Sequence, residues 1–135
     1  MDIAVNYLAI IVAAIAAMAL GFIWYHPKVF GGAWMRMAGV NPEGTPKQKM
    51  MVHMVLGLLV AGVSAYVLAH FVVVWAALTW VDALQLGFWV WLGFQVPILA
   101  GAVLWDKKPW ALFYINAGYQ LITMVVMALI LVLWV

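Results

Sequence analysis

Four stretches of this 135-residue chain are long and apolar enough to cross a lipid bilayer, and they constrain the fold more than any other feature. A bilayer core is about 30 Å thick, so a helix that rises about 1.5 Å per residue needs about 20 apolar residues to span it. The stretches fall near Ile3–Tyr25, Met50–Trp75, Trp80–Trp105 and Pro109–Val135. Hydrophobic residues make up 70% of the chain and charged residues 7%, a composition too apolar for a water-soluble domain. We therefore predict an all-α, polytopic membrane protein whose single four-helix domain covers residues 1–135.

The basic residues of the chain are confined to two segments between the apolar stretches. Four lie between the first and second stretches and two between the third and fourth: Lys28, Arg36, Lys47, Lys49, Lys107 and Lys108. Lys and Arg beside spanning helices are retained on the cytoplasmic side of a membrane. Because the first and third connections of a four-span protein lie on the same side, we expect both termini on the non-cytoplasmic side. The net charge of +2 comes from these flanking residues and indicates no nucleic-acid partner.

Helix boundaries are marked by local signals. Thr45-Pro46-Lys47-Gln48 and Thr79-Trp80-Val81-Asp82 have the spacing of N-terminal capping boxes, and Pro109 suits the first turn of the last helix. Asn41-Pro42-Glu43-Gly44 is typical of a turn. Between the first two spans, apolar residues recur at helical spacing from Phe30 to Ala38, which predicts a short interfacial helix.

Aromatic residues lie near the ends of the predicted spans, where Trp and Tyr anchor helices at the membrane surface. At the level of the basic segments these are Trp24, Tyr25, Trp105 and Trp110, whereas Trp89 and Trp91 lie deeper. We interpret most of the Trp residues as anchors.

Three short patterns resemble a known family. They are Trp24-Tyr25-His26-Pro27 followed by Phe30-Gly31 and Trp34-Met35, then Leu86-Gly87-Phe88 with Trp91-Leu92-Gly93-Phe94, and finally Ile115-Asn116-Ala117-Gly118-Tyr119. The chain resembles, over its whole length, an uncharacterised family of small bacterial four-helix membrane proteins, domain of unknown function 1761. The resemblance implies four spans and a bacterial inner membrane, and it implies no activity. A small polar residue is more usual in that family at the position of His26, so a family-wide role for His26 is not expected.

Polar residues inside the predicted spans need partners, because lipid offers no hydrogen bonds. Asn116, Gln120 and Thr123 lie on one face of the fourth span, with Asn116 about 10 Å deep and Gln120 about 16 Å deep. Gln95 of the third span lies about 15 Å deep, and Pro97 beside it predicts a kink. We expect Gln95 and Gln120 to meet. The pair then either lines a solute site, as broken helices do in transporters, or only holds two helices together.

Two of the histidines could bind a cofactor, which is an alternative to a solute site. His26 and His53 are expected at a similar depth on facing helices, an arrangement that suits axial haem ligation. The spans carry no deep carboxylate and no His-x-x-His or Glu-x-x-His spacing, and the chain has no Cys. We therefore predict no cofactor and no metal, and keep His26 and His53 only as the ligands of the haem alternative. Because no catalytic constellation is present, we also expect no enzymatic activity.

Small residues form two stripes at intervals of four. Ala9, Ala13, Ala17 and Gly21 make the first, and Gly57, Ala61 and Ala65 the second. Such stripes let helix backbones approach closely in lipid, either within one subunit or between subunits. We expect the first stripe to face a helix, and Ile11 and Ile15 on the opposite side to face lipid or looser packing.

Three functions remain open from the sequence. One is a transporter or channel for a small solute that uses Gln95, Asn116 and Gln120. The second is an accessory or assembly subunit of a larger membrane complex. The third is a haem- or lipid-binding protein that uses His26 and His53. The expected partners are the bilayer and either further copies of the chain or other membrane subunits.

Overall fold

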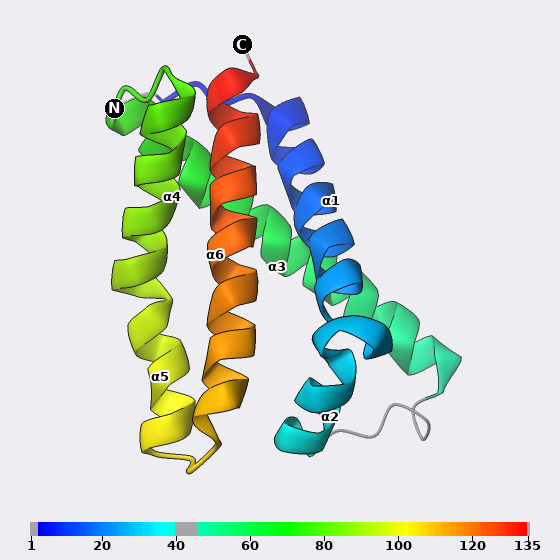
Figure 1. Ribbon diagram of the computed structural model, residues 1–135. Helices are drawn as coiled ribbons and strands as arrows, with labels where there is room; N and C mark the ends of the chain where they lie inside the picture. The colour runs from blue at the N-terminus through cyan, green and yellow to red at the C-terminus, as the bar shows by residue number, and fades with distance from the viewer. Residues whose placement is uncertain (1–2, 40–45, 135) are drawn as a thin grey trace.

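The computed structural model describes residues 3–39 and 46–134, and it is helical almost throughout (Figure 1). The elements are α1 (Tyr7–Trp24), the π-helix η1 (Pro27–Gly31), α2 (Gly32–Ala38), α3 (Lys47–Val74), α4 (Trp80–Phe94), α5 (Val96–Leu104) and α6 (Trp110–Leu133). The described residues contain no strand, which confirms the all-α prediction. Four segments are long and apolar enough to cross a membrane, namely α1, α3, α4 with α5, and α6.

The third predicted span is divided at Gln95. The α4 helix ends at Phe94 and α5 begins at Val96, because the proline ring at Pro97 removes the N–H that would bond the Gly93 carbonyl. Hydrogen bonding resumes directly, since the Leu99 N–H donates to the Gln95 carbonyl over 2.9 Å. The kink predicted from Pro97 is therefore confirmed, and it turns the Gln95 side chain beside α6.

The helix start predicted for α4 is correct, whereas those predicted for α3 and α6 are shifted by one residue. The capping box of Thr79 and Asp82 is confirmed, with the Asp82 N–H donating to the Thr79 hydroxyl over 3.2 Å. Pro46 and Pro109 precede α3 and α6 as their N-caps, one position before the expected first turn. Thr45 and the turn predicted at 41–44 lie outside the described residues.

The short helix predicted between the first two spans is also present. It has two parts, since the π-helix η1 leads directly into α2. The His26 Nδ1 accepts a hydrogen bond from the Lys28 N–H over 3.1 Å and so caps the π turn. Gly31 completes the turn so close to Tyr25 that a Cβ at Gly31 would overlap the Tyr25 carbonyl. The glycine of the first family-like pattern is thus required by the way the chain folds back after α1.

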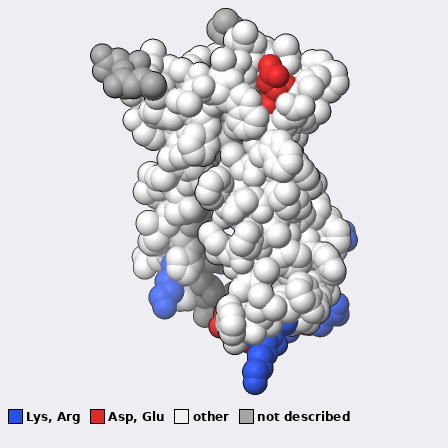
Figure 2. Space-filling view, turned by 90° about the vertical axis from the view of Figure 1, so that its left-hand side faces the viewer, with Lys and Arg blue, Asp and Glu red and all other residues white. Residues whose placement is uncertain are grey.

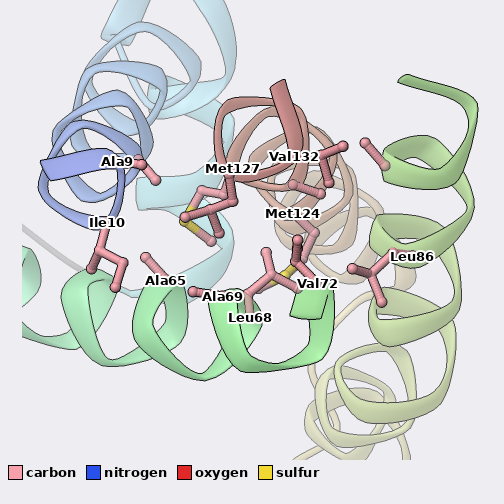
Figure 3. Close-up of a cluster of buried hydrophobic side chains, with 14 of the residues drawn as sticks. Ala9, Ile10, Ala65, Leu68, Ala69, Val72, Leu86, Met124, Met127 and Val132 are labelled. Carbon is pink, nitrogen blue, oxygen red and sulfur yellow. The ribbon is translucent and has the colours of Figure 1, made fainter. Parts of the chain in front are cut away.

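The core occupies the half of the bundle where the described chain begins and ends. Figure 3 shows side chains of α1, α3, α4 and α6 meeting there, including Ala9, Ala65, Leu86, Met124 and Met127. All the buried residues of α3 lie between Ala65 and Val72, and none lies in its first half. Figure 1 shows that half of α3 leaning away from α5 and α6. The bundle is therefore closed at one end and open at the other.

The small-residue stripes are used inside the protomer. Ala9, Ala13 and Ala17 are at most 2% exposed and belong to the core, whereas Ile11 and Ile15 are 55% and 53% exposed. This confirms that the α1 stripe faces other helices and that the opposite side does not. In the second stripe Ala65 is fully buried, and a Cβ at Gly57 would touch the Met18 sulfur of α1 at 3.5 Å. Residues of both stripes thus pack against other helices of the same chain.

The basic side chains lie at one end of the bundle. Lys and Arg gather at one end in Figure 2, the end formed by η1, α2, the start of α3 and the α5–α6 connection. We call this the basic end. Asp82 lies at the opposite end, at the start of α4. The open half of the bundle is the half at the basic end.

Candidate ligand-binding cleft

A cleft of about 790 Å³ opens at the basic end, where α3 leans away from α5 and α6. It is bounded by α1, α2, α3, α5 and α6. Its polar lining consists of Tyr25, His53, Asn116, Tyr119 and Gln120, with Trp34 beside them. The remaining lining is apolar or glycine: Met18, Gly21, Phe22, Met50, Met54, Gly57 and Leu99. The cleft thus joins a polar side on α6 to apolar walls on α1, α3 and α5.

Hydrogen bonds fix the polar side. The Tyr25 hydroxyl donates to the Asn116 Oδ1 over 2.7 Å. The Tyr119 hydroxyl donates to the Ala17 carbonyl of α1 over 2.9 Å. The Tyr25 ring also lies edge-on to the rings of Trp34 and Tyr119, with centroids 5.5 Å and 5.2 Å away. These contacts hold Asn116 and the aromatic wall in one arrangement.

Two tryptophans tie the same part of α6 to its neighbours. The Trp24 Nε1 donates to the Ile115 carbonyl over 2.9 Å, and the Trp91 Nε1 donates to the Ala117 carbonyl over 2.8 Å. The Trp24 ring packs directly against Gly118, because a Cβ at Gly118 would lie only 3.0 Å from the Trp24 Cζ2. The three family-like patterns, far apart in sequence, therefore meet on one stretch of α6.

Gln95 and Gln120 are brought together as predicted. The Gln95 Nε2 donates to the Gln120 Oε1 over 3.2 Å. Gln120 lines the cleft, whereas Gln95 lines a second hollow of about 410 Å³ between α3 and α4, next to Ser64. The Gln95 Oε1 is buried and has no hydrogen-bond partner among the described residues. The amide pair thus lies between two hollows.

The other predicted site residues divide between the cleft and the core. Asn116 lines the cleft, and Pro97 shapes the break in the third span. Thr123 shares the helix face of Asn116 and Gln120, yet it is only 4% exposed and is absent from the cleft lining. The polar face of α6 is therefore not one continuous site, because its last member is enclosed by the core.

The two histidines are placed differently. His53 lines the cleft from α3, whereas His26 caps η1 and is not part of the lining. The cleft therefore does not bring together the His26–His53 ligand pair considered from the sequence, and His53 alone remains as a candidate ligand contact.

The sequence reasoning missed Trp24, Tyr25, Trp91 and Tyr119 as members of the polar network. The positions of Trp24 and Tyr25 at the end of a span predict surface anchors. Their N–H and O–H groups instead bond α6, as buried aromatic donors commonly must. The sequence feature that indicates their role is the indole N–H or the hydroxyl O–H of each ring. In lipid such a group needs a hydrogen-bond partner as much as an amide does.

Comparison with known proteins places the chain in a family. The profile of the family described as "Protein of unknown function (DUF1761)" matches residues 8–132. The chain belongs to this family. The match confirms the resemblance drawn from the three patterns, and its range includes every residue that lines the cleft. A search of curated proteins and a search of solved structures each found no match.

A double-mutant cycle tests the coupling of the amide pair in this DUF1761 chain. We expect Gln95→Leu and Gln120→Leu each to lower the free energy of unfolding by about 1 kcal/mol, because each strands its partner. The double variant should lose less than the sum of the single variants. Gln85→Leu, at an exposed amide of α4, is the matched control and should have little effect. Thermal unfolding in mild detergent provides the measurement, and strictly additive losses would contradict the coupling.

Proposed function

We propose that this protein is a membrane-embedded binding protein that holds a small molecule in the cleft at the basic end and has no catalytic activity of its own. The observation that carries the proposal is the convergence of Tyr25, Asn116, Tyr119, Gln120 and His53 on one hollow. Internal hydrogen bonds pair part of these groups, but the NH2 groups of Asn116 and Gln120 donate to no acceptor among the described residues. Polar groups inside a membrane are costly unless they are paired or used. The cleft therefore supports ligand binding better than a purely structural role for these residues.

A carrier is the second candidate, and the second hollow favours it. Gln120 lines the cleft, Gln95 lines the other hollow, and the hydrogen bond between them lies on the boundary. Transporters place substrate sites at broken helices near the middle of the membrane, and the third span is broken at Gln95. One protomer of four spans rarely encloses a pathway, so a carrier would act as a homo-oligomer. The accessory-subunit alternative has no comparable support among the described residues.

We propose the bacterial inner membrane as the location, with the basic end in the cytoplasm and both termini outside it. All six Lys and Arg residues lie at the basic end, which is the distribution expected of a cytoplasmic surface. The cleft would then open in the cytoplasmic half of the bilayer.

Single cysteines test this orientation, since the natural chain has none. Leu78→Cys lies at the exposed connection between α3 and α4, and Asp106→Cys at the basic end. In cells whose outer membrane is permeabilised, we expect an impermeant maleimide to label Leu78→Cys and to label Asp106→Cys only after inner-membrane lysis. The reverse pattern would overturn the proposed orientation.

Co-purification tests ligand binding. We expect the protein, purified in mild detergent, to carry a small molecule that mass spectrometry detects in its organic extract. Leu99→Trp, which adds bulk to the lining of the cleft, should deplete that molecule severalfold. The neighbouring Ile98→Trp is the matched control, because Ile98 is 76% exposed and outside the lining, and it should retain the wild-type amount. Equal extracts from all three proteins would contradict binding in the cleft.

A further inference from the structure

The polar side of the cleft offers hydrogen-bond donors. The Asn116 Oδ1 already accepts from the Tyr25 hydroxyl, and the Gln120 Oε1 already accepts from the Gln95 Nε2. Among the described residues neither NH2 group donates to a protein acceptor, and neither is a fully buried unpaired atom. Both residues line the cleft, so a ligand there can reach their NH2 groups. A carboxamide nitrogen can only donate. A complementary ligand must therefore bring acceptors.

The ligand that matches this cleft is uncharged. None of the lining residues is Lys, Arg, Asp or Glu. Asn116 and Gln120 lie about 9 Å and 15 Å along α6 from its start at Trp110, well below the level of lipid headgroups. A phosphate or carboxylate at that depth would have no Lys or Arg as a permanent counter-charge, which makes its desolvation unfavourable. Neutral carbonyl oxygens meet the donors without that cost.

The walls of the cleft suit a ligand that comes from the bilayer. Phe22, Met50 and Met54 belong to the lining and are exposed, so the cleft is open to the surroundings of the bundle along these side chains. Methionine side chains adapt readily to flexible apolar groups. An apolar tail can therefore extend along these walls while the polar part of the ligand reaches α6.

The two donor residues lie one above the other on α6, and this arrangement suits a polar group with two separated acceptors. Asn116 and Gln120 are separated by one helical turn, which puts their Cβ atoms about 5–6 Å apart. The two carbonyl oxygens of a 1,4-quinone are separated by a similar distance and lie on opposite edges of a flat ring. Tyr25, Trp34 and Tyr119 provide aromatic surfaces beside the donors. We propose that the cleft binds a quinone, with its carbonyls on Asn116 and Gln120 and its tail along the Met-lined wall.

This inference rests on the proposed binding function and is tested with defined probes. Protein in phosphatidylcholine nanodiscs is titrated with decylubiquinone, and in parallel with decylbenzene, which has a ring and the same tail but no carbonyls. We expect decylubiquinone to raise the unfolding temperature saturably and decylbenzene to leave it unchanged. Asn116→Leu should weaken decylubiquinone binding about tenfold, as the loss of one hydrogen bond implies. Gln85→Leu removes an amide outside the cleft and should bind as the wild type does.

Further variants separate the possible outcomes. If Asn116→Leu does not fold, Leu99→Trp and Ile98→Trp replace it, with binding weakened in the first and kept in the second. Equal stabilisation by decylbenzene, or wild-type binding of decylubiquinone by both Asn116→Leu and Leu99→Trp, would overturn the quinone assignment. A co-purified molecule that is not a quinone, with no response to decylubiquinone, would overturn the assignment and leave the binding function standing. No response and no co-purified molecule would overturn both.

Discussion

Hydrogen bonds to one stretch of α6 are the interactions on which the rest of the structure depends. Within Ile115–Gln120, two carbonyls and two side-chain oxygens accept from Trp24, Trp91, Tyr25 and Gln95, and the Tyr119 hydroxyl donates to α1. Lipid cannot replace these bonds, so losing one leaves a polar group without a partner. This requirement fixes the height and rotation of α1 and α4 against α6. The lean of α3 opens the cleft beside this stretch, and two of the amide NH2 groups there donate to no acceptor among the described residues.

The two ends of the bundle differ because α3 packs into the core at one end only. At the closed end, Ala9 and Ala13 of α1 and Ala65 and Ala69 of α3 let the backbones approach, and Met127 fills the space between them. Towards the basic end α3 leans away from α5 and α6, and Met50, His53 and Met54 line the gap. A separation filled by Met and Phe side chains is tolerable in lipid, because lipid tails cover apolar surface as well as protein does. The closed end therefore stabilises the bundle, and the open end contains the cleft.

The sequence predicts the elements of this fold better than their arrangement. The spans, the burial of the α1 stripe and the Gln95–Gln120 contact follow from length, periodicity and depth, which act locally along each helix. The lean of α3 does not follow from these properties, because it depends on which residues of other helices it meets. For that reason the cleft was not predicted, and Thr123 was grouped with Asn116 although the core encloses it.

The tryptophans show a second limit of sequence reasoning. Trp24 and Trp110 both lie beside a basic segment, and position alone makes both of them anchors. In the structure Trp110 is 52% exposed and fits that interpretation, whereas Trp24 donates a hydrogen bond to α6. The difference arises from Gly118, which makes room for one ring and not for the other. Such a relation between residues about 90 positions apart becomes visible only when the helices are placed.

The most direct test of the central claim compares three Trp→Phe variants by thermal unfolding in the same detergent. Each keeps an aromatic ring and removes the indole N–H. If the bonds to α6 hold the bundle together, Trp24→Phe and Trp91→Phe should each lower the free energy of unfolding by about 1 kcal/mol, whereas Trp110→Phe, on the exposed surface, should unfold as the wild type does. Equal effects of all three substitutions, or none from Trp24→Phe and Trp91→Phe, would contradict the claim that these hydrogen bonds organise the fold.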